Sequence, residues 1–94
     1  MTTITDIADR KRFEARDDQD QLLGFVEYQQ ADDRITFTHT EVLPAFEGKG
    51  IGSTLARAVL DQARADGLSV VPQCPFIKTW IDRHPDYQDL VHQH

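Results

Sequence analysis

The pattern of hydrophobic and polar positions in the first half of the chain predicts three β-strands. Residues 12–16 and 34–42 alternate with a period of two, which places every second side chain on the same face. Residues 21–29 form the strand between them, with apolar side chains at Leu22, Leu23, Phe25, Val26 and Tyr28. Short acidic stretches at 17–20 and 31–33 are typical of tight turns. Consecutive strands joined by tight turns predict an antiparallel meander.

Two further features of this half are interpreted from local pattern alone. The first ten residues show no sustained period and are interpreted as a frayed lead-in. Gly24 lies inside the second strand, where a glycine indicates a bulge.

After residue 50 the spacing of apolar residues changes from two to about four. Ile51, Leu55, Val59 and Ala63 form one stripe and predict an amphipathic helix, which Gly67 ends as a left-handed cap. Residues 68–71 form a short apolar strand, and a strand–helix–strand succession predicts a right-handed crossover to a parallel neighbour.

A second, shorter helix is predicted over residues 74–81, with Pro75 at its first position. Phe76, Ile77 and Trp80 are expected in the core, and residues 88–94 are interpreted as a tail. The element order β-β-β-α-β-α predicts an α+β fold, and we expect a single domain over residues 1–94.

Composition and charge exclude several classes of protein. A formal net charge of −6 argues against partners such as nucleic acid and anionic membranes, which require basic patches. No apolar run approaches the ~20 residues that span a bilayer, and residues 1–6 lack the pattern of a signal peptide. The chain has one cysteine, so the expected location is a reducing cytoplasm. His92 and His94 have no third ligand nearby, so no metal site is expected.

The negative charge is concentrated in the first half. Residues 1–43 hold ten acidic and five basic side chains, whereas residues 44–94 hold six and five. One interpretation is that the acidic half attracts a cationic amine; the other is that the charge serves solubility alone.

The stretch most suggestive of ligand binding joins the third strand to the first helix. Gly48, Gly50 and Gly52 alternate there, so the backbone can adopt positive φ or approach a ligand closely. The amides of such a loop and of a helix start form an anion-binding surface, to which Lys49 adds a positive charge. A phosphate or pyrophosphate is the expected ligand.

Two common phosphate motifs do not fit this stretch. The dinucleotide fingerprint requires a third glycine where this chain has Ser53. The P-loop requires Ser or Thr directly after Gly-Lys, and Gly50 follows Lys49 instead.

The stretch resembles the acyl-CoA pyrophosphate loop of the GNAT superfamily of N-acetyltransferases, written Arg/Gln-x-x-Gly-x-Gly/Ala. The pattern falls on residues 47–52, where Glu47 replaces the usual Arg or Gln. Very short members of that superfamily also share three further motifs, present here at residues 39–42 (His-Thr-Glu-Val), 74–76 (Cys-Pro-Phe) and 84–87 (His-Pro-Asp-Tyr).

The resemblance implies a compact GNAT-like fold that takes acetyl-CoA and transfers its acetyl group to an amine. It also implies a cofactor site on two adjacent segments. In the superfamily, backbone amides at the splayed end of the central strand bind the thioester and pantetheine, a role that falls here on Glu41, Val42 and Leu43. The implied pyrophosphate site comprises Glu47, Gly48, Lys49, Gly50, Ile51, Gly52, Ser53 and Thr54.

Cys74 is the first candidate catalytic residue. It precedes a proline at a helix start, where the helix dipole favours a thiolate. Three interpretations remain open: a nucleophile that accepts the acetyl group, a side chain that only lies beside the thioester, and a small buried hydrophobic residue.

His39 is the second candidate. The alternation places it on the same face as Ile35 and Phe37, followed by Glu41, which suggests a general base with a carboxylate partner; a hydrogen-bonded core histidine is the alternative. His84 and Tyr87 either close the cleft, with Tyr87 as an acid, or pack the last turn.

The functional expectation is an acetyl-CoA-dependent N-acetyltransferase acting on a small-molecule or protein amine. An acyl-CoA-binding module with little or no transfer is the alternative, and a protein-interaction domain on the same fold is a third class. We expect a monomer or a weak dimer.

Overall fold

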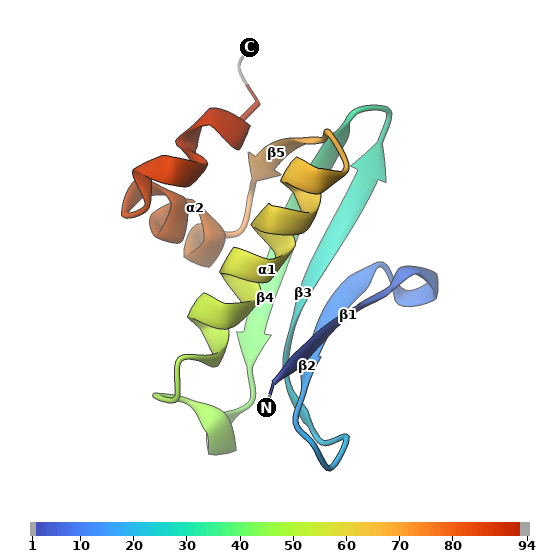
Figure 1. Ribbon diagram of the computed structural model, residues 1–94, viewed down its shortest axis with the longest axis vertical. Coiled ribbons are helices and arrows are strands. Elements are labelled where there is room, and N and C mark those ends of the chain that lie inside the picture. The colour runs from blue at the N-terminus through green and yellow to red at the C-terminus, as the bar shows by residue number, and fades with distance from the viewer. Residues whose placement is uncertain (1, 93–94) are drawn as a thin grey trace.

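The computed structural model describes residues 2–92 and is built around a five-stranded sheet in the order β1-β2-β3-β4-β5 (Figure 1). The strands β1 to β4 are antiparallel, and β5 lies parallel to β4. Their bounds are Thr3–Ile7, Arg12–Arg16, Leu22–Ala31, Arg34–Val42 and Ser69–Pro72. The structure confirms the predicted meander, the crossover and the α+β class.

The interpretation of the first ten residues as a frayed lead-in is wrong. Residues Thr3–Ile7 form β1, which pairs with β2 from Thr3↔Arg16 to Ile7↔Arg12, and Ala8–Arg10 form a 3₁₀ turn. Every position of β1 is exposed or half-buried, so this edge strand carries no apolar face that a periodicity could reveal. The segment is a strand because its backbone pairs with β2, and no local pattern in the sequence indicates this pairing.

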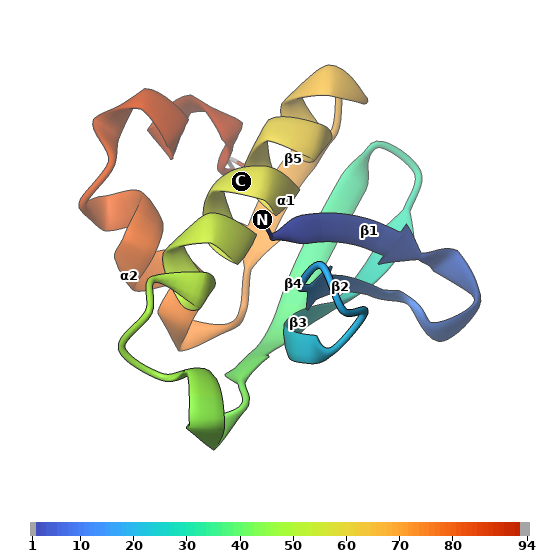
Figure 2. The same ribbon diagram turned by 60° about the horizontal axis from the view of Figure 1, so that its bottom comes forward.

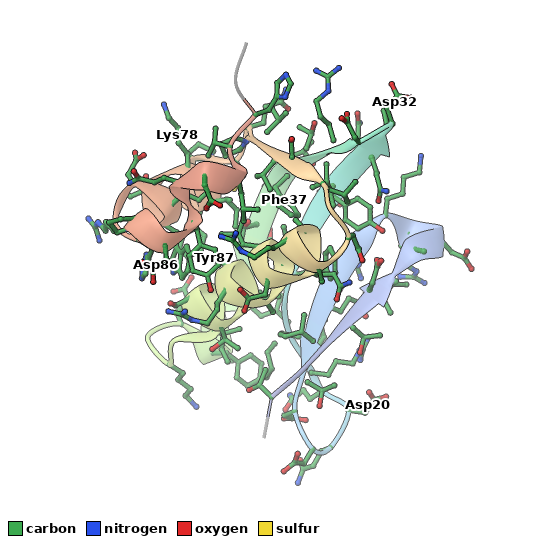
Figure 3. All side chains as sticks on the ribbon, turned by 45° about the horizontal axis from the view of Figure 1, so that its top comes forward. Asp20, Asp32, Phe37, Lys78, Asp86 and Tyr87 are labelled. Carbon is green, nitrogen blue, oxygen red and sulfur yellow. The ribbon has the colours of Figure 1, made fainter. Side chains whose placement is uncertain are left out.

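Two helices cover one part of the sheet (Figures 1 and 2). The long helix α1 (Ile51–Ala65) crosses the face of the sheet, and α2 (Pro75–Asp82) lies beside it with the 3₁₀ segment η3 (Pro85–Leu90). The stripe predicted for α1 is buried at Ile51, Leu55, Ala56, Val59, Leu60 and Ala63. Phe37 lies in the interior beneath the helix, whereas Asp20 and Asp32 lie at turns (Figure 3).

A β-bulge in β4 moves His39 off the face that the alternation predicted. Tyr28 pairs with Phe37 and Glu27 pairs with His39, so Thr38 is an extra residue. Beyond the bulge the alternation is inverted, and Thr40 takes the side of the buried Phe37 while His39 and Glu41 take the other, exposed side. A second irregularity lies beside Gly24: Ala15 pairs with Gly24 and Arg16 with Leu22, which leaves Leu23 as the extra residue.

The pairing of β4 with β5 is short. It runs from Arg34↔Ser69 to Phe37↔Pro72, while β4 continues to Val42 with β3 as its ladder partner. The outer side of β5 receives Val91, through a bridge to Val70 and a 2.8 Å hydrogen bond from the His92 N–H to the Val70 carbonyl. The prediction of a tail over residues 88–94 is therefore wrong for residues 88–92. These residues complete η3 and then cover the outer edge of β5.

The structure also bears on membrane spans and metal sites. No helix within residues 2–92 is long and apolar enough to cross a membrane. Over the same residues there is no cluster of three or more side chains suited to a metal ion. His94, part of the histidine pair considered above, lies outside the described residues.

Candidate functional site

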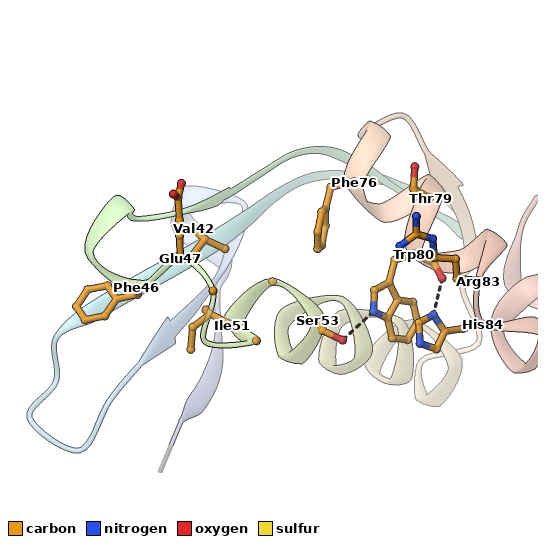
Figure 4. A pocket seen from close by; sticks show the side chains of 13 residues that line it. Val42, Phe46, Glu47, Ile51, Ser53, Phe76, Thr79, Trp80, Arg83 and His84 are labelled. Atoms are coloured by element: carbon orange, nitrogen blue, oxygen red, sulfur yellow. Dashed lines mark hydrogen bonds between the residues drawn. The ribbon is translucent and has the colours of Figure 1, made fainter.

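A cavity of about 470 Å³ opens between the glycine stretch and α2 (Figure 4). This is within the range of small-molecule sites in proteins. One wall comes from the end of β4, the loop and the first turn of α1; the other comes from α2 and the residues after it. The lining residues are Val42, Phe46, Glu47, Gly48, Gly50, Ile51, Gly52, Ser53, Phe76, Thr79, Trp80, Arg83 and His84.

The loop wall has the backbone geometry of an anion site. Gly48 and Gly50 adopt left-handed φ values of 80° and 77°, and Gly50 is the N-cap of α1. The first intrahelical bond runs from the Thr54 N–H to the Gly50 carbonyl, so the three preceding N–H groups have no carbonyl one turn back. These donors at the positive end of the helix dipole line the pocket together with the glycine backbone.

Gly52 serves a different purpose, because it makes room for an aromatic ring. A Cβ at Gly52 would lie 2.8 Å from the Phe76 Cζ, too close for any residue other than glycine without movement of that ring. Phe76 itself is 42% exposed, so its predicted place in the core is wrong. The ring lies against the first turn of α1 and forms part of the pocket wall (Figure 4).

Three side chains tie the two walls together (Figure 4). The Trp80 Nε1–H donates to the Ser53 Oγ at 2.9 Å, which links α2 to the first turn of α1. The His84 ring stacks on Trp80 at 3.7 Å between centroids, and its Nδ1 lies 2.6 Å from the Trp80 carbonyl oxygen. Trp80 is 6% exposed, as predicted for a core residue, but it also lines the pocket.

The predicted cofactor residues divide into two groups. Seven line the pocket: Val42, Glu47, Gly48, Gly50, Ile51, Gly52 and Ser53. Three do not: the Leu43 N–H donates to the Leu23 carbonyl at 2.9 Å, the Thr54 hydroxyl donates to the Gly50 carbonyl, and the Lys49 Nζ lies 5.8 Å from the centre of the Phe46 ring.

Sequence reasoning missed most of the α2 wall. Phe76, Thr79, Trp80 and Arg83 follow the three- and four-residue spacing of one helix face. That face is mixed in character, and it lies next to the buried stripe of Ile77 and Ile81. The spacing was visible in the sequence, but nothing local distinguished a pocket-lining face from an ordinary exposed one.

Cys74 takes the predicted position at the start of α2 but not a place in the pocket wall. It is the N-cap residue, its N–H donates to the Phe37 carbonyl at 2.8 Å, and Pro75 follows. The thiol is 3% exposed and donates to the Thr40 Oγ1 at 3.3 Å. Thr40 reaches this position because of the bulge at Thr38. The thiol is thus buried beside residues 38–42 of β4, the part of the strand that does not pair with β5.

His39 and Glu41 lie together on the exposed face of β4. The His39 Nε2 is 3.4 Å from the Glu41 Oε1, and the His39 ring lies 6.0 Å from that of Phe25. The expected pair of histidine and carboxylate is present, on the face of the sheet opposite α1.

His84 and Tyr87 take different roles. His84 lines the pocket. Tyr87 is buried, its hydroxyl donates to Asp61 at 2.8 Å and accepts from Arg57 at 3.2 Å. The hydrogen bond to Asp61, together with burial, raises the pKa of Tyr87, and its side chain does not line the pocket. Tyr87 therefore packs the last turn.

Comparison with known proteins gives a consistent family. The family model described as GCN5-related N-acetyl-transferase matches residues 12–90. Protein NATD1 of Gallus gallus is 34% identical over 58 residues, which cover 62% of this chain and 53% of that protein. The chain thus spans about half the length of this curated relative.

Solved structures show the same fold. A GCN5-like putative N-acetyltransferase from Staphylococcus aureus superposes with a TM-score of 0.73 at 28% identity, over 98% of this chain and 89% of that one. A ribosomal-protein-alanine N-acetyltransferase from Brucella melitensis biovar Abortus gives a TM-score of 0.61 at 23% identity, over 88% of this chain and 62% of that one, a likeness of fold alone. Since the family model matches most of its length, the chain belongs to the GCN5-related N-acetyltransferase family.

Proposed function

We propose that the protein transfers the acetyl group of acetyl-CoA to an amine. The observation that carries this proposal is the pocket at the start of α1, where the backbone of Gly48 and Gly50 and the first helical amides form one wall. A pyrophosphate is the ligand that such a wall suits best, and the family supplies the identity of the donor.

The residues present fit coenzyme A. A Cβ added at Gly50 would meet nothing within 4 Å, so the space beside this backbone is open to a ligand. The N–H groups of residues 51–53 and the backbone of the loop would hold the pyrophosphate, and Val42 would contact the arm that follows. When bound, acetyl-CoA supplies an activated acetyl thioester.

We place the reaction at residues 38–42 of β4, the half of the strand that does not pair with β5. Cys74 and Thr40 lie on one side of this strand segment, and His39 and Glu41 lie on the other. An amine that arrives from the exposed face of the sheet meets the His39–Glu41 pair, which is suited to removing its proton before attack. His39 therefore acts as general base with Glu41 as its partner in this proposal.

The charge and the single cysteine of the chain suggest the setting of the reaction. The acceptor is a small-molecule or protein amine rather than a nucleic acid or a membrane component, in keeping with the net charge of −6. The free thiol of Cys74 suits a protein of the reducing cytoplasm. We further propose that the protein works as a monomer or a weak dimer.

The test is mass spectrometry of reactions that contain the protein, acetyl-CoA and a panel of amines. An acetylated amine and free coenzyme A in equal amounts are expected. Binding of coenzyme A by calorimetry without any product would instead indicate an acyl-CoA-binding module. Absence of both binding and product would overturn the proposal.

A pair of glycine variants tests the position of the site. Gly50→Ala and Gly67→Ala both force a side chain into a left-handed backbone, at φ +77° and +70°, with open space around the added Cβ. Each should therefore lose a similar free energy of unfolding, about 1–2 kcal/mol. Only Gly50→Ala should also weaken coenzyme A binding, because Gly67 ends α1 at the other end of the helix.

A further inference from the structure

Arg83 contributes a positive charge to the wall of the pocket. It follows the last residue of α2, and its backbone N–H donates to the Thr79 and Trp80 carbonyls, both at 3.2 Å. Within residues 2–92 no carboxylate forms an ion pair with its guanidinium. By contrast, Arg12, Arg16 and Arg64 each pair with an acidic side chain. As far as residues 2–92 are concerned, the charge of Arg83 is therefore available to an anionic ligand in this pocket.

The groups around Arg83 suit a second anion. Thr79, one turn earlier on α2, also lines the pocket and is exposed, so its hydroxyl is available as a donor. The last carbonyls of α2 are already occupied: the Trp80 oxygen by His84, the Ile81 oxygen by the His84 N–H, and the Asp82 oxygen by Gln88. This bonding reduces the negative potential that a helix C-terminus would otherwise direct at an anion.

His84 contributes differently from Arg83. The Trp80 carbonyl can only accept a hydrogen bond, so the His84 Nδ1 must carry the hydrogen. In the neutral ring the Nε2 is then an acceptor, which does not favour an anion. The guanidinium of Arg83 presents a planar set of N–H donors, which matches the oxygens of a phosphate.

The two donor surfaces face the same cavity from opposite walls (Figure 4). The amides of the first turn of α1 lie on one side, and Thr79 and Arg83 lie on the other. The 2.9 Å hydrogen bond from Trp80 to Ser53 joins the walls. A ligand with two separate phosphate groups can therefore contact both at once.

We infer that Arg83, with Thr79, binds the 3′-phosphate of coenzyme A. This inference rests on the proposed function and adds a specificity determinant to it. The 3′-phosphate is chemically separate from the pyrophosphate assigned to the loop, and it is absent from dephospho-coenzyme A and from phosphopantetheine-bearing carriers. Arg83 thus makes the pocket selective for thioester donors that carry the complete nucleotide.

The test compares coenzyme A with 3′-dephospho-coenzyme A by calorimetry on the full chain and two variants. Arg83→Gln removes the charge inside the pocket, and Lys78→Gln removes one charge from the exposed side of the same helix, outside the pocket (Figure 3). The wild type should bind coenzyme A about tenfold more tightly than the dephospho form, the scale expected of one charge-assisted contact. Arg83→Gln should remove this preference by weakening coenzyme A alone, and Lys78→Gln should keep it.

Each other outcome overturns the inference in a recognisable way. Equal binding of both ligands by the wild type would mean that the 3′-phosphate is not recognised. If Arg83→Gln weakened the binding of both ligands equally, the guanidinium would contact a group that coenzyme A and its dephospho form share. The same loss in Lys78→Gln would indicate long-range charge rather than contact. If neither ligand bound the wild type, with folding verified by circular dichroism, the proposed function itself would fail.

Discussion

At the scale of single residues, Thr38 decides which side chains lie on each side of β4. Its insertion as an extra residue turns Thr40 toward Cys74 and turns His39 and Glu41 to the exposed face. The Cys74 thiol donates a hydrogen bond to the Thr40 hydroxyl and is buried from solvent. A buried side chain outside the pocket wall is poorly placed to attack a bound thioester, which favours direct attack of the amine over a two-step route.

Cys74→Ala tests this choice. We expect turnover to fall by less than about tenfold, whereas loss of an obligatory nucleophile would lower it by about 10³-fold or more. The measurement is the initial rate at varied concentrations of both substrates, with intersecting lines expected for the wild type. Detection of an acetylated Cys74 that forms and discharges as fast as turnover would contradict direct transfer. Slow acetylation that never discharges would show only that the thiol lies near the thioester.

At the scale of elements, α1 approaches the sheet closely at the end that carries the pocket. Gly24 of β3 lies beneath this contact. A Cβ there would lie 2.6 Å from the Glu41 carbonyl oxygen and 3.3 Å from a methyl carbon of Leu55. Gly24 therefore determines how closely β4 and α1 can approach β3. The position of the loop between β4 and α1 depends on this distance.

Gly24→Ala should destabilise the protein by about 1–3 kcal/mol, because the closest atom belongs to the backbone and cannot rotate away. Urea unfolding measures the loss. Gln29→Ala, at an exposed position of the same strand, is the control and should change the free energy of unfolding by less than about 0.5 kcal/mol. A Gly24→Ala variant as stable as the control would show that the strands and helix can separate here without cost.

At the scale of the whole molecule, the sheet is covered unequally. Its face opposite α1 carries a buried carboxylate, Glu14, held by Arg12 at 2.6 Å and Arg16 at 2.9 Å. Arg12 also lies over the Phe25 ring, 4.6 Å from its centre. Burial alone would raise the pKa of Glu14, but the hydrogen bonds from Arg16 and Arg12 outweigh it and lower that pKa. These side chains cover the face of the sheet opposite α1, where no helix packs within the described residues.

The stability of the protein should therefore fall in acid. A carboxyl whose pKa is lowered by folding stabilises the folded state at pH values above its ordinary pKa of 4.5, and this contribution is lost as the pH falls through the lower, folded-state value. Glu14→Gln should cost about 1–3 kcal/mol at neutral pH, since two arginines lose their anion. The difference from wild type should shrink as the pH falls below about 4.

Urea unfolding at several pH values measures this difference, with Glu27→Gln on the neighbouring strand as the control. A gap between wild type and Glu14→Gln that stays constant down to acid pH would show that Glu14 acts by packing rather than by charge.

Local signals in the sequence determined the order of elements, the fold class and the loop of the site. The β4 strand was predicted with its observed bounds, and α1 begins at the predicted residue, because alternation, the four-residue stripe and the glycines act within a few neighbouring residues. The pocket wall at residues 47, 48 and 50–53 followed from the same glycines.

Only the tertiary structure decided the rest, and the physical reason is the same at each point. The edge strand β1 exists through pairing with β2, the bulge at Thr38 through the register of β4 against β3, and the α2 wall through the contacts of Phe76 with Gly52 and of Trp80 with Ser53. Each depends on contacts between two different elements, about which the periodicity and composition of one segment carry no information. The sequence placed the glycine loop, and the packing of α2 against α1 turned it into one wall of a pocket.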